Sequence, residues 1–253
     1  MTTAVVISAS LAGTRAPGAA LELLSDRYAL EIMVERARRT PGADLVVCAI
    51  PELDGEDPLA EAALEAGALV VRAPDAAPLE GVRRAAAEAD AGRVLHVCGV
   101  QPFYDPVIAG GVLALLTDTR ADIATNAAPA LFPDGLDCEA FDSGLLAGLS
   151  AGGGERVIDE MEVRRYANLR GPGGGLERLR WRLDHHADIE FARAVHGALG
   201  PAACTAGAAE IAGLCLRRPD ITAINTAFID EARLTGGERG AIQTRPVSLL
   251  RAA

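Results

Sequence analysis

The residues best placed for chemistry lie within the first twenty positions. A short apolar run rich in β-branched residues leads into a loop of small residues that carries one basic side chain, Arg15. The glycines Gly13 and Gly18 in this loop allow a close backbone approach to a ligand or a tight turn. In a parallel-sheet protein, such a loop presents backbone N–H groups and a cation to a phosphate chain. We therefore expect residues 10–18 to form a phosphate-binding loop with Arg15 as its cation.

The elements that would position this loop follow an alternating pattern. Strands are expected at residues 4–9, 44–50, 68–72 and 93–98, and helices at 21–39, 58–66, 79–89 and 105–116. The strands are too apolar for one face to meet water, so the pattern predicts an α/β fold, three-layer and doubly wound, with a mostly parallel sheet. Ligands of such sheets bind beyond the carboxyl ends of the strands, where the loop with Arg15 should lie.

The pattern changes after Asn126. A turn and a short strand are expected over 132–141, a charged helix over 155–169, a strand over 179–184, and helices at 187–198 and 208–217. Glycine-rich joints stand on both sides of the charged segment. We expect one domain over 1–200 with a dimerisation arm at 150–178, followed by a helical C-terminal extension over 201–253.

Composition excludes several classes of function. The formal net charge of −11 argues against a general nucleic-acid binder, and all 24 basic residues are arginines, so no P-loop lysine or lysine Schiff base is possible. The five cysteines are scattered without a C-x-x-C pair, which predicts free thiols. The sequence has no run of 18 apolar residues and no basic-then-apolar signal peptide. A cytoplasmic protein without a membrane partner is therefore expected.

Four segments resemble a known family when they are read in order. They are Gly13-Thr14-Arg15 with Pro17, the loop 99–106, Asn126 with the turn 132–137, and the segment 179–184 ending at Asp184. In this order they resemble the cytidylyltransferases of the spore-coat polysaccharide type, a group similar to the enzymes that activate neuraminate and Kdo with CTP. Residues 218–225 also look like the C-terminal piece of that group.

The resemblance implies a nucleotidyltransferase-like (nucleotide-diphospho-sugar transferase, Rossmann-like) fold and a reaction. CMP would pass from CTP to a sugar or sugar acid in surface polysaccharide or related biosynthesis, with Mg²⁺ neutralising the developing charge. CTP or another nucleotide, a sugar and a second copy of the chain are the implied partners.

The resemblance also implies the residues of the site. Arg15 and Asp184 would be catalytic, and Asp184 would bind the metal. The nucleotide would contact Ser8, Ala9, Ser10, Ala12, Gly13, Thr14, Arg15 and Gly99. The acceptor sugar would contact Gln101, Asn126, Asp134, Asp137 and Glu139.

Structural roles compete with several of these assignments. Asn126 has two open interpretations, acceptor binding and a turn cap, and Asp134 lies in an ordinary Pro-Asp-Gly turn signal. Asp137 and Glu139 alternate along one strand and would share a face as a small acidic patch. Among the histidines, His96 is expected in the core and His196 on a helix surface.

The sequence departs from the family pattern at three positions. Ser10 and Ala19 stand where the family carries an arginine and a lysine, and Val100 replaces a metal-binding aspartate. An isopropyl group cannot ligate Mg²⁺. Three functions stay open: a working cytidylyltransferase, a catalytically degenerate homologue that serves as a nucleotide-binding or partner subunit, and a glycosyltransferase. The last would normally display an Asp-x-Asp motif after the fourth strand, which is missing.

Overall fold

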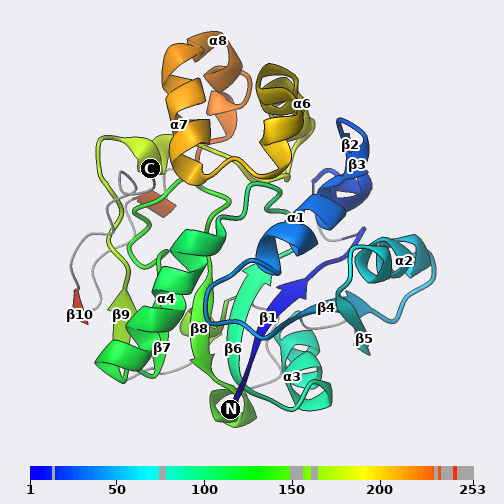
Figure 1. Ribbon diagram of the computed structural model, residues 1–253, viewed down its shortest axis with the longest axis vertical. Coiled ribbons are helices and arrows are strands. Elements are labelled where there is room, and N and C mark those ends of the chain that lie inside the picture. Colours follow the sequence, from blue (N-terminus) through cyan, green and yellow to red (C-terminus); the bar gives the residue numbers. More distant parts are fainter. Residues whose placement is uncertain are drawn as a thin grey trace.

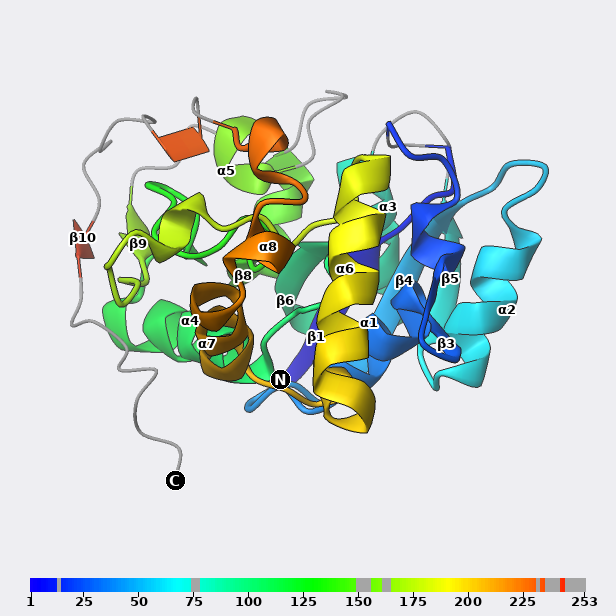
Figure 2. The same cartoon turned by 90° about the horizontal axis from the view of Figure 1, so that it is seen from above.

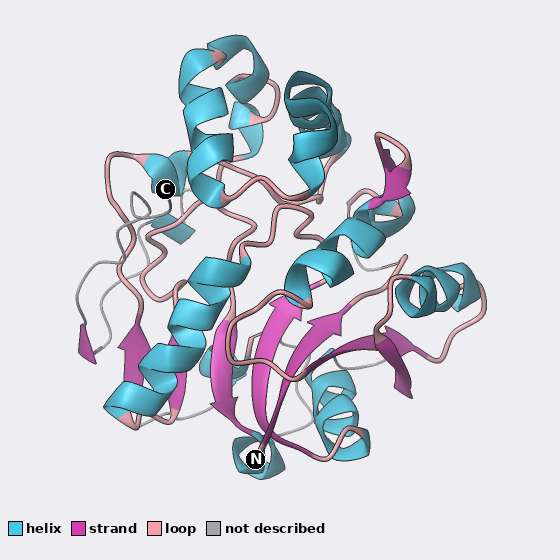
Figure 3. Cartoon of the chain, viewed as in Figure 1, coloured by secondary structure: helices cyan, strands magenta, loops and turns pink. Residues whose placement is uncertain are grey.

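An eight-stranded sheet lies at the centre of the protein (Figures 1 and 3). The computed structural model describes residues 1–12, 15–73, 78–148, 156–160, 165–230, 233–234 and 242–243. Within them the strand order is β10-β9-β7-β8-β6-β1-β4-β5. The strands are β1 (Thr2–Ser8), β4 (Leu45–Pro51), β5 (Leu69–Ala73), β6 (Ala91–Cys98), β7 (Ile123–Thr125), β8 (Glu139–Asp142), β9 (Tyr166–Asn168) and β10 (Ile242–Gln243). Only β8 runs antiparallel to its neighbours.

Helices cover both faces of this sheet, which confirms the expected three-layer α/β fold (Figure 2). One face carries α1 (Ala29–Ala37), α2 (Asp57–Glu65) and α4 (Pro106–Thr119), and the other carries α3 (Pro78–Glu88) and α5 (Val157–Glu160). Three further helices gather at one end of the sheet (Figure 1): α6 (His186–Leu199), α7 (Ala208–Arg217) and α8 (Pro219–Thr222). Short 3-10 segments complete the described structure: η1 (Ala19–Leu21), η2 (Ser143–Gly148), η3 (Leu176–Arg178), η4 (Gly200–Cys204) and η5 (Thr226–Phe228).

The central strands end at the same level, which brings their loops together. Ser8, the last residue of β1, pairs with Ala49 of β4 and with Cys98 of β6. The next residue after β6 is Gly99, and a Cβ at this position would lie 2.5 Å from the Cβ of Ala9. Only glycine therefore allows the two strand ends to approach this closely.

The helix expected over 21–39 is wrong in its first half. A two-stranded hairpin, β2 (Leu23–Leu24) with β3 (Arg27–Tyr28), precedes α1, and Ser25 in its turn has a φ of 67°. Ser25 and Asp26 are residue types that favour turns, but the spacing of the apolar residues around them is helical and predicted a helix instead. The remaining helices and strands of the first half lie close to their expected positions.

Two expectations for the second half are also wrong. The segment 179–184 is not a strand of the sheet; it is an irregular stretch with a single bridge between Arg180 and Asp134. The charged pattern over 155–169 is not one helix, because Tyr166–Asn168 forms strand β9 beside β7. Residues 155 and 161–164 of that pattern lie outside the described residues, and the dimerisation arm remains a prediction.

Helix α7, which lies in the expected C-terminal extension, packs against the rest of the chain. Ile211 and Leu214 of α7 join the same apolar cluster as Leu30 of α1 and Leu113 of α4. This shared cluster does not test the division into a domain over 1–200 and an extension over 201–253, which stays a prediction. Among the helices that the structure describes, none is both long and apolar enough to span a membrane.

Candidate functional site

Arg15 and Asp184 meet although they are far apart in the sequence. The loop after β1 carries Arg15, whose Nη1 lies 3.5 Å from Oδ2 of Asp184. The side chain of Arg15 is 73% exposed, whereas that of Asp184 is 14% exposed. Backbone bonding places Asp184 at the carboxyl end of β6, because the N–H of Leu183 donates to the carbonyl of Val100 at 2.8 Å. Gly13 and Thr14 lie outside the described residues.

Two more arginines surround the same carboxylate oxygen. Arg182 Nε lies 3.4 Å and Arg180 Nη2 lies 3.6 Å from Oδ2 of Asp184. Both come from the irregular segment before α6, where they alternate with Trp181. Three guanidinium groups therefore converge on Asp184, where sequence reasoning had expected Arg15 alone.

A buried carboxylate holds this arrangement in place. Asp188 accepts two hydrogen bonds of 2.9 Å from Arg180, and one of its oxygens accepts the backbone N–H groups of Asp184 and His185. Asn225 donates to its other oxygen at 2.9 Å. Burial alone would raise the pKa of Asp188, but the Arg180 guanidinium and these N–H groups outweigh it and lower the pKa. An acid three residues beyond a helix start is a known cap signal that sequence reasoning had missed.

The loop after β1 contains an unexpected internal partner, Glu56. Its side chain accepts the Ser10 hydroxyl at 2.7 Å and the N–H of Leu11 on both oxygens at 2.9 and 3.0 Å. Glu56 is only 2% exposed. The N–H of Ala12 in turn donates to Ser10 Oγ at 3.1 Å. The N–H groups of Leu11, Ala12 and Gly18 in the predicted phosphate loop therefore already have partners within the chain.

The other predicted nucleotide contacts form the junction of β1 and β6. The Ser8 hydroxyl lies 2.9 Å from Nε2 of His96, and the Ser8 carbonyl accepts the N–H of Gly99 at 2.7 Å. Ala9 is buried and donates its N–H to Ala49. Burial lowers the pKa of His96 to about 4, so this core histidine is neutral at physiological pH. The role of Ser8, Ala9 and Gly99 toward a nucleotide remains a prediction.

The predicted acceptor residues fall into two groups. Asn126 is fully buried and holds the turn after it, since its amide donates to the Leu136 carbonyl and accepts the Cys138 N–H. Gln101 is 5% exposed, and its Oε1 has no hydrogen-bond partner among the described residues. Of these two amides, only Gln101 has a carbonyl oxygen without a partner among the described residues, and that oxygen is itself buried.

Arg233 lies near two of the three acidic acceptor candidates, Asp134 and Asp137, whereas Glu139 has partners of its own. Asp134 accepts from Arg180 Nη1 at 2.9 Å, and its pKa is raised because burial outweighs its arginine neighbours. Glu139 accepts the N–H groups of Val157 and Ile158 at the start of α5. Burial raises the pKa of Glu139 to about 7.

The third acid, Asp137, pairs with Arg233, a residue that sequence reasoning had missed. Nε of Arg233 lies 3.1 Å from Asp137, and its Nη2 donates to the Phe132 carbonyl. Burial would lower the pKa of Arg233, but the Asp137 carboxylate outweighs it and raises that pKa. The C-terminal segment therefore returns to the turn that was predicted to border the acceptor sugar.

His185 and His196 both pack against aromatic rings. The ring of His185 stacks on Phe228, with centroids 4.2 Å apart. His196, which was expected on a helix surface, is 1% exposed. Among the described residues, no group of three or more His, Cys, Asp or Glu side chains is arranged to hold a metal.

The described residues do not fit an Mg²⁺ ion held by the protein itself. Mg²⁺ binds oxygen ligands at about 2.0–2.1 Å, so an ion on Oδ2 of Asp184 would stand beside three guanidinium groups. Two unit charges 4 Å apart interact with about 4 kcal/mol near a protein surface, and a divalent ion doubles this repulsion. Val100, at the position of the second expected ligand, packs against the core.

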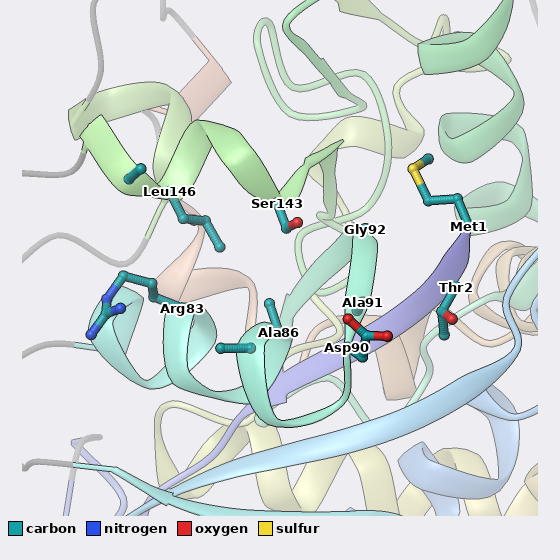
Figure 4. A pocket seen from close by; sticks show the side chains of 11 residues that line it. Met1, Thr2, Arg83, Ala86, Asp90, Ala91, Gly92, Ser143 and Leu146 are labelled. Carbon is teal, nitrogen blue, oxygen red and sulfur yellow. The ribbon is translucent and has the colours of Figure 1, made fainter.

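A cavity of about 580 Å³ lies at the opposite end of the sheet (Figure 4). Met1 and Thr2 at the start of β1, Ala91 and Gly92 at the start of β6, and Leu146 contribute to its lining. These positions are the amino ends of the strands. The cavity is therefore separate from the site around Arg15 and Asp184.

Comparisons with solved structures agree on the fold. A cytidylyltransferase from Leptospira borgpetersenii serovar Hardjo-bovis aligns over 88% of this chain and 97% of its own, with 19% identity and a TM-score of 0.78. A CMP:2-keto-3-deoxy-manno-octonic acid synthetase complexed with CTP aligns over 78% and 99%, with 15% identity and a TM-score of 0.56. Rv0371c from Mycobacterium tuberculosis H37Rv, in complex with manganese, aligns over 76% and 98%, with 21% identity and a TM-score of 0.52.

Sequence comparison does not add to this result, since no protein-family model and no curated protein match the chain. The identities with the solved structures are low, so these similarities establish the architecture and leave the substrate open. This architecture is supported by the strand order, by the parallel pairing and by the aligned share of each chain. The chain has the fold of the cytidylyltransferases.

Proposed function

We propose that the protein binds CTP beyond the carboxyl ends of β1 and β6 and transfers CMP to a sugar or sugar acid. The observation that carries this proposal is the 3.5 Å approach of Arg15 to Asp184 in a chain with the cytidylyltransferase fold. The CMP-sugar-acid synthetase among the structural neighbours, which was solved with CTP, supports the choice of nucleotide and acceptor.

The chain's own residues suggest how the reaction proceeds. An oxygen of the sugar attacks the α-phosphorus, the bond between the α- and β-phosphates breaks, and pyrophosphate leaves. Arg15 is exposed and would neutralise the leaving phosphates together with Arg182, whose side chain is 27% exposed. Asp184 orients both guanidinium groups through its ion pairs. Gln101, with its unpartnered Oε1, is the residue that we assign to the acceptor.

A second candidate is a subunit that binds the nucleotide without turnover. The observation that favours it is the absence of a second carboxylate at position 100, where Val100 packs against the core beside the Asp184 segment. Loss of one electrostatic group typically costs about 10²–10³ in rate. A protein that has lost several such groups would still bind the phosphates.

Pyrophosphate release separates the two candidates. The purified protein is incubated with CTP, Mg²⁺ and a panel of acidic and amino sugars, with Arg15→Ala as the comparison. Release that depends on a sugar and falls at least about a hundredfold in Arg15→Ala supports the transferase. Binding of CTP in a calorimeter with no release supports the subunit, and failure to bind any nucleotide contradicts both.

We also propose that the protein is a homodimer that uses the segment 150–178. Its charged composition and its position between glycine-rich stretches motivate this proposal. Sedimentation equilibrium should give twice the monomer mass of 26.1 kDa. A single monomeric species at micromolar concentration would contradict it.

A further inference from the structure

The arginines around Asp184 differ in how firmly they are held. Arg180 is fixed, since it forms hydrogen bonds of 2.9 Å with the buried acids Asp134 and Asp188. Arg15 and Arg182 are more exposed and contact Asp184 through ion pairs of 3.5 and 3.4 Å. Nη1 of Arg182 also lies 3.8 Å from Oδ1 of the buried Asp134. The ion pairs of Arg15 and Arg182 are longer than the 2.9 Å hydrogen bonds of Arg180, so these two guanidinium groups are the ones that can change partner.

Asp184 is the counter-ion of these arginines. Its Oδ2 lies within 3.6 Å of all three guanidinium groups, and its backbone N–H is anchored on Asp188. A metal ligand needs a free lone pair facing a space without positive charge. Asp184 instead faces three positively charged guanidinium groups. Such a cluster of arginines is suited to binding an anion such as phosphate.

We propose that Arg15 and Arg182 bind the phosphates of the nucleotide without a divalent cation, with Asp184 as the counter-ion that the phosphates displace. This inference rests on the proposed function for the identity of the nucleotide. The phosphate oxygens take over the guanidinium groups that Asp184 holds in the unliganded protein. Arginine suits this exchange because its planar fork matches phosphate and its charge is permanent.

Calorimetry in EDTA and in Mg²⁺ tests the proposal, with CTP and with inorganic pyrophosphate as separate probes. The wild-type protein should bind each probe with affinities that agree within about twofold in the two buffers. Arg182→Gln should weaken binding in EDTA by about tenfold, because one charge-assisted contact is lost. Arg217→Gln, on the exposed surface of α7, is the matched control and should bind as the wild type does.

Asp184→Asn distinguishes the counter-ion from a metal ligand through the sign of its effect. Removing the counter-ion should tighten binding by about tenfold in EDTA and in Mg²⁺, whereas removing a metal ligand would weaken binding in Mg²⁺. Asp118→Asn, on the exposed surface of α4, removes the same charge elsewhere. The backbone N–H of residue 184 still bonds to Asp188 in this variant, so the fold should be retained, which a thermal melt verifies.

The outcomes separate this inference from the proposed function. The inference would be overturned if either probe bound more than about tenfold more tightly in Mg²⁺ than in EDTA, or if Asp184→Asn bound more weakly than the wild type in either buffer. The proposed function would still stand. Pyrophosphate binding in EDTA without any CTP binding would support the arginine site and contradict the function. If neither probe binds in either buffer, both proposals fail.

Discussion

Glu56 accepts the backbone N–H of Leu11 on both oxygens of its buried carboxylate, at 2.9 and 3.0 Å. A residue of the β4–α2 connection therefore holds the loop after β1 in shape. The same carboxylate places a negative charge beside the loop that we expect to meet phosphates. This relationship leads to the first prediction.

Replacing Glu56 with alanine should destabilise the protein by about 1–3 kcal/mol, because the Leu11 N–H and the Ser10 hydroxyl lose their buried acceptor. Glu56→Gln keeps one acceptor oxygen and should cost less. Urea unfolding measures both values. The control is Glu61→Ala on the exposed side of α2, and a Glu56→Ala protein as stable as this control would refute the assignment.

Glu139 should make part of the stability depend on pH. Burial raises its pKa to about 7, from an ordinary value near 4.5, so the folded state binds more protons than the unfolded state between these values. The contribution of Glu139 is therefore fully present below about pH 4.5 and is lost as pH rises through 7. The total is roughly 3 kcal/mol at most.

The difference between wild type and Glu139→Gln isolates this effect. Subtraction is needed because His96 and His196, whose pKa values are both lowered to about 4 by burial, change the stability in the opposite direction over acidic pH. Free energies of unfolding measured from pH 4 to pH 8 should show the wild type losing stability relative to the variant. A pH-independent difference would show that folding does not shift the pKa of Glu139.

Arg36 joins α1 to the C-terminal extension. This buried guanidinium donates to the carbonyls of Tyr104, Ala203 and Ala206, and burial lowers its pKa to about 10. Arg36→Met should cost about 3 kcal/mol or more, since three buried carbonyls lose their donors. Chemical unfolding and limited proteolysis around residue 206 check this, and the control is Arg39→Met, whose side chain is exposed at the surface. A cost equal to that of the control would refute the role.

Gly99 should not tolerate a methyl group. In Gly99→Ala the new Cβ would lie 2.5 Å from Ala9 Cβ and 2.9 Å from Ala9 Cα, so two strand ends must separate at a cost of about 1–3 kcal/mol. Gly197→Ala is the matched control, because nothing lies within 4 Å of its added Cβ and a helix gains from alanine there. Equal melting temperatures for the two variants would contradict this account.

The sequence by itself determined the layered architecture and the edge of the sheet at which Arg15 lies. Apolar runs and helical periods are local patterns, so β1, β4, β5, β6 and α7 lie where the sequence predicts them. The rule that ligands bind beyond the carboxyl ends of parallel strands then placed Arg15 at the right edge. The hairpin before α1 was missed because its turn consists of two ordinary polar residues.

Only the tertiary structure decided which charges meet. The pairs Arg15–Asp184 and Arg233–Asp137 join residues more than ninety positions apart, and no periodicity encodes such a contact. Burial likewise decided that Asn126 and Glu139 bond their polar atoms to backbone groups, because a polar atom removed from water must find a partner nearby. The contacts of the candidate site therefore depend on long-range packing, which a linear pattern of residues does not contain.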